Sequence, residues 1–211
     1  MQKEAQPLLD KLANPAERTV CGKRIFTGEL YNRPTGVVIC GVGKVNAACG
    51  AQYAIDCLGA DEIINLGVAG GLNASVKTGE IYCVSQAVQY DFDLTQLNGT
   101  RIGTLDECNE NYLPLKRGGY PERKLATGDR FNDSKDDYRL LTEELQADIR
   151  DMEGAAIAQV CMHAKVPFRS FKIISDIAGS GSTTEQYLKN LSLCFETLTR
   201  ELQNITELIY G

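Results

Sequence analysis

Two acidic segments carry the side chains best suited to proton transfer. Asp176 closes the apolar run 168–174, where partial burial raises the pKa of a carboxyl group and suits it to donate a proton. A cap on the following element is an equally good interpretation. Glu153 precedes the helical pattern that runs to Ala164, and carboxylates at helix starts are most often caps or dipole partners. Its two oxygens could instead accept hydrogen bonds from two neighbouring sugar hydroxyls.

A third candidate is the small-residue segment Asn65–Gly71, which follows the apolar pair Ile63–Ile64. Glycine and alanine let a ligand approach the backbone closely. The spacing matches no dinucleotide-binding or P-loop motif, and a simple turn is the commoner meaning of such a segment. All three candidates follow apolar runs, and ligands of α/β proteins bind at the carboxyl ends of strands.

The elements that must position these residues alternate between strand and helix. The patterns predict a hairpin of strands 24–30 and 36–40, a helix from 44 to about 58, and a helix over 153–164. Further strands are expected at 62–67, 81–88, 124–128 and 168–174, and a long amphipathic helix at 188–209. A polar excursion spans 95–122. This alternation predicts one α/β sandwich domain.

Composition narrows the function classes. The 211 residues carry a net charge of −6 and no basic cluster, which argues against a nucleic-acid partner. No apolar run reaches the roughly 18 residues of a membrane span, and the polar first residues indicate no secretion signal. Eight cysteines without a Cys-x-x-Cys pair predict small buried thiols in a reducing cytoplasm. The only histidine, His163, lies in a helical apolar pattern and is expected to be structural.

In this order the motifs resemble those of the 5′-methylthioadenosine/S-adenosylhomocysteine nucleosidases, within the purine nucleoside phosphorylase superfamily. The resemblance covers nearly the whole chain and rests on these segments: Gly41–Ala48, Asn65–Gly71, Tyr90–Thr95, Thr127–Phe131, Asp151–Ala155 and Ser175–Asp176. It implies a single-domain three-layer α/β sandwich over 1–211, in which helices flank a mixed central sheet. The expected reaction is hydrolysis of the N-glycosidic bond of methylthioadenosine or adenosylhomocysteine, which releases adenine in methionine salvage. The resemblance further implies a cytoplasmic homodimer, whose contact includes the 95–115 excursion, and no metal or organic cofactor.

The resemblance also assigns roles to residues of the base and sugar sites. Asp176 would protonate N7 of the purine, with Ser175 helping to position it. Glu153 would hold the ribose 2′ and 3′ hydroxyls, and its charge would stabilise an oxocarbenium-like transition state. Met152 would lie against the sugar face. Phe131 would stack on the purine, while the backbone beside it would read the base edge.

The remaining roles concern the pocket walls and the nucleophile. Ala69 and Gly70 would line the base pocket, and Val42 would touch the 5′-thioalkyl group. Glu4 stands where the family has its water-activating carboxylate, ahead of a helix expected at 8–12. The family begins with a glycine-rich strand that leads into this position, and this sequence is expected to lack that strand.

Two further departures bear on the reaction. Val68 replaces a serine or threonine of related proteins and offers no hydroxyl to a phosphate, which favours water as the nucleophile. The loop 178–183 is shorter than in the family, and Tyr187 would take over part of the 5′ pocket. Three alternatives stay open: a nucleoside phosphorylase, a hydrolase of another purine nucleoside such as futalosine, and a nucleoside-binding protein with weak catalysis.

Overall fold

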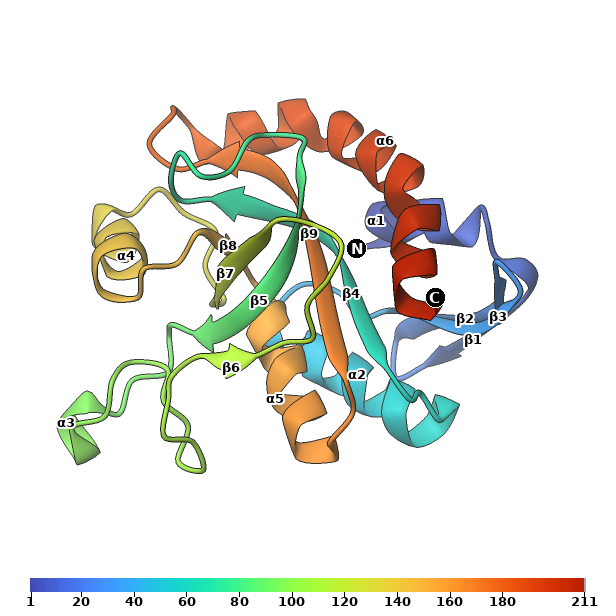
Figure 1. Ribbon diagram of the computed structural model, residues 1–211, viewed down its shortest axis with the longest axis horizontal. Coiled ribbons are helices and arrows are strands. Elements are labelled where there is room, and N and C mark those ends of the chain that lie inside the picture. The colour runs from blue at the N-terminus through green and yellow to red at the C-terminus, as the bar shows by residue number, and fades with distance from the viewer. Residues whose placement is uncertain (211) are drawn as a thin grey trace.

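The computed structural model describes residues 1–210 and contains a curled central sheet with helices on both sides (Figure 1). The N-terminal elements are α1 (Gln2–Leu9), β1 (Ala13–Val20), β2 (Lys23–Leu30), β3 (Arg33–Ile39), α2 (Lys44–Leu58) and β4 (Ile63–Gly71). The middle of the chain forms β5 (Ile81–Gln89), α3 (Thr95–Asn98), β6 (Leu113–Pro114), β7 (Glu122–Thr127), α4 (Lys135–Arg139) and the π-helical turn η1 (Leu140–Glu144). The C-terminal elements are β8 (Ile149–Asp151), α5 (Gly154–Ala164), β9 (Phe168–Ile177) and α6 (Thr183–Tyr210).

The central sheet is mixed, as expected. Its strand order is β6-β5-β7-β8-β4-β9, and β5 also pairs with β9, so the sheet curls back on itself. The β4–β9, β5–β7 and β7–β8 pairs are parallel, whereas β8 pairs with β4 in the antiparallel sense. Helices α2 and α5 pack together on one side, and α6 covers β9 on the other (Figure 1). The predicted three-layer α/β architecture is confirmed.

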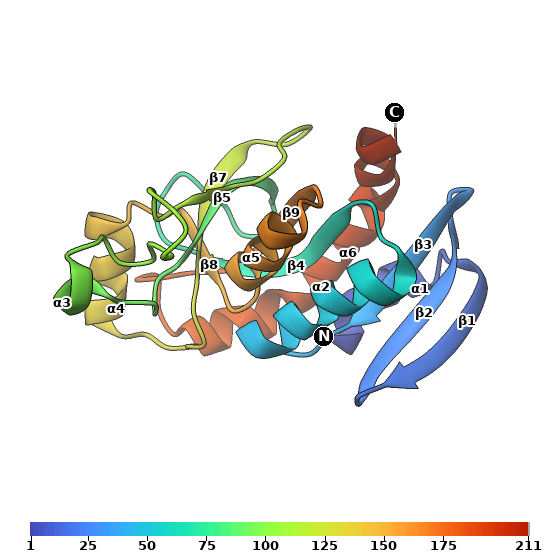
Figure 2. The same ribbon diagram turned by 90° about the horizontal axis from the view of Figure 1, so that it is seen from below.

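Strands β1, β2 and β3 form a separate antiparallel sheet (Figure 2). The predicted hairpin is confirmed, with a tighter turn than the sequence indicates. Tyr31 and Asn32 alone connect the strands, and both have positive φ, as the primed hairpin turns require. Strand β1 was not predicted, because its eight residues are almost all exposed and carry no apolar alternation.

Apolar contacts join the layers on both sides of the central sheet. One cluster of buried residues lies between the sheet and the helices α2 and α5, and includes Ala51, Leu125 and Ile157. On the other side Phe171 and Ile173 of β9 pack against α6. This packing explains the amphipathic pattern of α6, since one apolar stripe faces β9 and continues onto the small sheet at Leu202.

Some expectations at the ends of elements were wrong. The first helix is Gln2–Leu9 instead of 8–12, so Glu4 lies within it. The segment Asn65–Gly71 is the body of β4, paired along β9, and not a turn. Only Cys83, Cys161 and Cys194 are buried, while three of the eight cysteines are exposed. No helix within residues 1–210 combines the length and apolar character needed to cross a membrane.

Candidate active site

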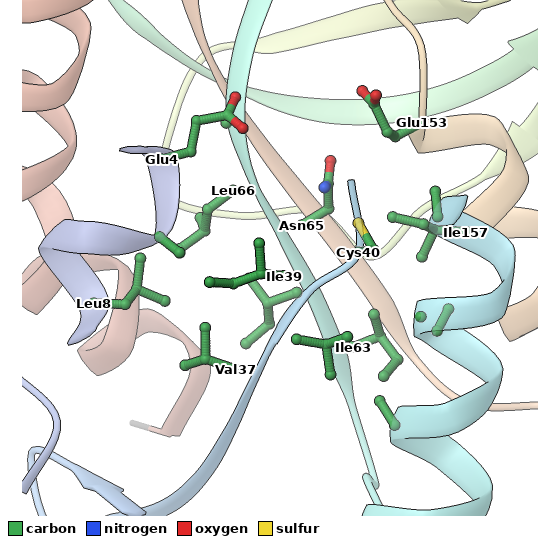
Figure 3. Close-up of a pocket in the computed structure, with 18 of the residues that line it drawn as sticks. Glu4, Leu8, Val37, Ile39, Cys40, Ile63, Asn65, Leu66, Glu153 and Ile157 are labelled. Atoms are coloured by element: carbon green, nitrogen blue, oxygen red, sulfur yellow. The ribbon is translucent and has the colours of Figure 1, made fainter. Parts of the chain in front are cut away.

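All the residues predicted from the sequence to form a site line one cavity of about 1100 Å³. Nine side chains or backbone segments line it: Glu4, Val42, Ala69, Gly70, Phe131, Met152, Glu153, Ser175 and Asp176. Figure 3 shows Glu4 and Glu153 at one end, pointing into the space. Apolar side chains such as Leu8, Val37 and Ile39 line the remainder (Figure 3). The cavity therefore has a charged end and a long apolar extension.

A bulge in β9 directs Asp176 toward the cavity. Ala69 of β4 is opposite Ile174, but the next residue, Gly70, is opposite Asp176, so Ser175 is an extra residue. Bulges commonly redirect side chains next to active sites. The Oδ1 atom of Asp176 accepts the Ser175 hydroxyl at 2.6 Å. The buried Oδ2 atom has no hydrogen-bond partner among the residues that the structure describes, so Asp176 is not a helix cap.

Gly70 provides the space into which Asp176 points. A Cβ atom added at Gly70 would lie only 2.8 Å from Oδ2 of Asp176. Burial raises the pKa of the Asp176 carboxyl, while the Ser175 hydrogen bond and the charge of Arg150 act in the opposite direction. A carboxyl group with a raised pKa and a free, cavity-facing oxygen has the properties of a proton donor.

Glu153 begins α5, but its side chain does not cap the helix. Asp151 takes that role, since its carboxylate accepts the backbone N–H groups of Glu153 and Gly154. The Glu153 carboxylate accepts the N–H of Gly43 at 2.9 Å and remains open to the cavity. Burial and the neighbouring Asp151 raise the pKa of Glu153, against the opposing effect of Lys172. The cap interpretation is thus wrong for Glu153, and Asp151 is the residue whose side chain caps α5.

A buried ion pair supports this end of the cavity. The Lys172 ammonium lies 2.9 Å from Asp151, and both side chains are only 2% exposed. Burial lowers the pKa of Lys172, but the carboxylates of Asp151, Glu153 and Glu4 outweigh it and the net shift is upward. Lys172 was not predicted as part of the site. Its only signal was a charge in the middle of an apolar strand.

Glu4 reaches the cavity from α1. Its Oε1 atom accepts the backbone N–H of Val68 at 3.3 Å, on the edge of β4, and its other oxygen pairs with the amino group of Met1. Gly67 leaves room for it, because a Cβ there would lie 2.9 Å from the same Oε1 atom. The residue is therefore held beside β4, facing the same space as Glu153 and Asp176.

Phe131 and Tyr187 form the aromatic wall. Their rings meet edge to face, with 5.5 Å between centroids. Half of the Phe131 surface is exposed, which leaves a face free for stacking. Arg150 also lines the cavity here and was not proposed from the sequence. Val42 also lines the cavity and is exposed.

Residues outside the cavity take no part in this arrangement. His163 lies in the last turn of α5, exposed, with its Nε2 atom 3.0 Å from Glu107. Within residues 1–210 no cluster of histidine, cysteine and acidic side chains has the arrangement of a metal site.

The apolar extension separates the two sheets. It is lined by residues of β3 and β4, strands that pair with β2 and with β8 and β9 respectively, but not with each other. Residues of α2 with small side chains, among them Ala47, Gly50 and Ala51, close one side. The space is larger than the roughly 300–1,000 Å³ typical of small-ligand pockets, so a nucleoside would fill only part of it.

Comparisons with known proteins agree with this geometry. A sequence profile of the phosphorylase superfamily matches residues 1–208. The 5′-methylthioadenosine/S-adenosylhomocysteine nucleosidase of Colwellia psychrerythraea is 32% identical over 92% of this chain and 88% of its own. A crystal structure of a nucleosidase of this name from the same organism, in complex with adenine, has a TM-score of 0.86 at 28% identity, covering 93% of this chain and 87% of that one.

An enzyme with a different printed substrate has a similar fold. The futalosine hydrolase of Helicobacter pylori has a TM-score of 0.90 at 24% identity, covering 98% of this chain and 94% of its own, which supports the fold alone. The profile match over nearly the full length and the 32% identity decide the family. The chain belongs to the phosphorylase superfamily and, within it, to the family of 5′-methylthioadenosine/S-adenosylhomocysteine nucleosidases.

Proposed function

We propose that this chain hydrolyses the N-glycosidic bond of a 5′-thioalkyl purine nucleoside, methylthioadenosine or adenosylhomocysteine, and releases the free base. The observation that carries the proposal is the buried Oδ2 atom of Asp176, which has no hydrogen-bond partner within residues 1–210, in a cavity that also holds Glu153 and Glu4. The names of the relatives supply the substrate class, and the cavity supplies the groups that the reaction needs.

The reaction divides between the two ends of the scissile bond. As Asp176 transfers its proton to N7, the electrons of the C1′–N9 bond move into the base, which leaves neutral. Glu153 accepts the ribose hydroxyls, and its charge stabilises the oxocarbenium-like sugar. Glu4 takes a proton from a water molecule as the water oxygen bonds to C1′. Ser175 holds Asp176 in place through its hydroxyl.

The base and the 5′ group have separate walls. Phe131 stacks on the base, Ala69 and Gly70 border it, and Met152 lies against the sugar. Val42 and Tyr187 would contact the 5′ substituent. Both line the cavity, Val42 precedes the Gly43 N–H that binds Glu153, and the carboxylates of Glu4 and Glu153 act on Tyr187.

Water is the proposed nucleophile, because the sugar end of the site has few free hydrogen-bond donors or positive charges to bind a phosphate. The N–H of Val68 already binds the Glu4 carboxylate, and the Lys172 charge is neutralised by Asp151. Incubation with methylthioadenosine in phosphate-free buffer should therefore release adenine and free methylthioribose. Base release that appears only after phosphate is added would instead identify a phosphorylase.

Hydrolysis of another purine nucleoside, such as futalosine, is a second candidate. It is favoured by one observation, the buried guanidinium of Arg150 beside Asp176. A panel of nucleosides that differ in base and in 5′ substituent would rank the two candidates. A protein that binds adenine in a calorimeter but turns over no nucleoside would support the third interpretation, a binding protein.

We further propose that the protein acts as a cytoplasmic homodimer. Its eight cysteines are unpaired, which suits a reducing compartment. The excursion that includes α3 projects from the sheet, with Leu97 80% exposed at its tip, and Val45 of α2 is 75% exposed (Figure 1). Light scattering should give twice the mass of one chain for the protein and half that value for Leu97→Asp, while Lys189→Asp should stay dimeric.

The apolar extension of the cavity lies beside Glu4, the residue proposed to activate water. We propose that the space between β3 and β4 is where the strand that the family places ahead of Glu4 would lie.

A further inference from the structure

Three charged residues from distant parts of the sequence meet at the start of α2. Lys44 is the first residue of that helix, Asp91 comes shortly after β5, and Asp129 comes shortly after β7. They lie outside the lining of the cavity, and the proposed reaction uses none of them. Their arrangement nevertheless connects two parts of the site.

Each of the three residues bonds to both of the others. The Lys44 ammonium donates to Oδ1 of Asp91, whose Oδ2 atom accepts the backbone N–H of Asp129 at 3.1 Å. The Asp129 carboxylate in turn accepts the backbone N–H of Lys44 at 2.9 Å. These three hydrogen bonds form a closed set, called here the Asp91 network.

Partial burial strengthens the Asp91 network. The side chains of Lys44 and Asp91 are only 17% and 15% exposed. Burial raises the pKa of Asp91, but the hydrogen bonds from Lys44 and from the Asp129 backbone outweigh it, and the net shift is downward. The carboxyl group is therefore charged at neutral pH, and charge-assisted hydrogen bonds are the strong ones. By contrast, Arg139 and Glu143 form an exposed pair of the kind that contributes little.

On one side, the Asp91 network holds a group of the sugar site. Gly43 directly precedes Lys44, and its N–H donates to the Glu153 carboxylate at 2.9 Å. Gly43 has a φ of 97°, which favours glycine, and a Cβ there would lie 3.2 Å from Oδ1 of Asp129. Asp129 can thus approach the start of α2 closely, and its bond to Lys44 fixes the neighbouring N–H that orients Glu153.

On the other side, the Asp91 network holds the loop of the base site. Asp129 precedes Phe131, the residue proposed to stack on the purine, by two positions. Beyond Phe131 the loop has other attachments, because the carbonyl of Asn132 accepts Nη2 of Arg150 at 2.9 Å and Asp133 accepts the N–H of Thr183 at 3.3 Å. Without the network the loop would remain attached to β8 and α6 but would lose these bonds to α2.

We propose that Asp91 is a positioning residue, which keeps the base site at Phe131 and the sugar site at Glu153 in a fixed relative position. This inference rests on the proposed function, since it concerns the same bond. Cleavage needs the base and the sugar to be placed together, and a displacement of about 1 Å can lower a rate about 10²-fold. Loss of the network should therefore impair ligands that span both sites and spare a ligand that occupies the base site alone.

The test compares methylthioadenosine, which spans both sites, with free adenine. Asp91→Asn keeps the size of the side chain but removes its charge and one acceptor oxygen. Its kcat/KM for methylthioadenosine should fall about 10- to 100-fold, while its calorimetric Kd for adenine stays close to the wild-type value. Asp91→Glu keeps both acceptors and should recover part of the loss, and Asp136→Asn, an exposed change in α4, should alter neither quantity. Equal losses for both ligands, or no loss for either, would overturn the inference.

A second variant tests whether the residues act as a unit. Lys44→Met removes the same hydrogen bond from the other side, so the double variant with Asp91→Asn should lose no more kcat/KM than the more impaired single variant. Losses that multiply would contradict a shared network. If Asp91→Asn does not fold, Lys44→Met decides through the same comparison of nucleoside and base.

Binding of the intact nucleoside separates this inference from the proposed function. If the wild-type protein binds methylthioadenosine without cleaving it, the proposed function fails. A calorimetric Kd for methylthioadenosine that rises about 10-fold in Asp91→Asn, with adenine binding unchanged, would still support the role of Asp91. An unchanged Kd for the nucleoside would contradict it.

Discussion

Replacing Asp176 by asparagine tests the proposed acid with little change of shape. The amide keeps an oxygen that can accept the Ser175 hydroxyl, which now binds Oδ1 at 2.6 Å. The other oxygen has no protein partner in the described chain, so the new amide nitrogen breaks no hydrogen bond. What the variant loses is the transferable proton.

The size of the effect follows from the role. A positioned general acid contributes about 10²–10⁴-fold, so kcat for methylthioadenosine should fall by that factor. This corresponds to about 3–5 kcal/mol of barrier. Because no hydrogen bond is lost, the free energy of unfolding should change by no more than about 1 kcal/mol near pH 4.

The pH dependence of stability gives an independent signature. The pKa of Asp176 is raised in the folded state, mainly by burial. Its contribution to stability is therefore fully present below the unfolded pKa of about 3.9 and is lost as pH rises through the folded value. The asparagine amide does not titrate, so the stability of the Asp176→Asn variant relative to wild type should increase between pH 4 and pH 7.

The assay combines adenine release with urea unfolding at both pH values, and Asp136→Asn, an exposed change in α4, serves as the control. A variant that keeps more than about one tenth of the wild-type kcat would refute Asp176 as the acid. A variant whose stability relative to wild type falls between pH 4 and pH 7 would refute the burial argument.

Three other predictions concern the charged end of the cavity. Glu4→Gln should lower kcat about 10²-fold with a similar KM, because the water loses its base while the nucleoside keeps its contacts; an unchanged kcat in steady-state assays would contradict this. Lys172→Met should lower the free energy of unfolding in urea by about 3–5 kcal/mol, since it leaves Asp151 buried without its counter-ion, and Asp151→Asn combined with Lys172→Met should recover part of the loss. The high-pH limb of kcat/KM should shift upward in Arg150→Met, because this positive charge holds down the pKa of the proposed acid, and a downward shift would argue against their proximity.

Periodicity was sufficient to predict the elements that pack against the central sheet. Helix α2 ends at Leu58 as expected, and β9 extends only a few residues beyond the predicted 168–174. These segments bury one or both faces, so apolar residues recur in their sequences at the spacing of a helix or a strand. Strand β1 buries almost none of its side chains, so its sequence shows no apolar alternation. Strand β8 has only three residues, which are too few to show a pattern.

The sequence located the candidate acid but not its surroundings. Asp176 ends an apolar strand, which is a local signal, and the cavity does receive it. The hydrogen-bond partners of Asp151 and the space that Gly70 leaves for Asp176 depend on which strands are neighbours. Arg150 and Lys172 are brought to the site by the pairing of β8 and β9 with β4, and no local spacing relates them to each other.

The charges in the cavity are arranged along the bond that is proposed to break. Around the sugar site, the three carboxylates of Glu4, Asp151 and Glu153 outnumber the two cations that lie among them, Lys172 and the amino group of Met1. The described groups at this end therefore sum to a net negative charge. At the base end Arg150, which forms no ion pair with the residues that the structure describes, lies beside a carboxyl group whose burial favours the neutral form. Cleavage of the C1′–N9 bond moves electrons from the sugar to the base, so positive charge develops where the carboxylates are and negative charge develops toward the guanidinium. A fixed field of this direction stabilises the transition state more than the ground state, because the bound nucleoside lacks that charge separation. The same arrangement explains why a buried lysine is retained under the sugar site: it reduces the repulsion among three carboxylates without cancelling their combined charge.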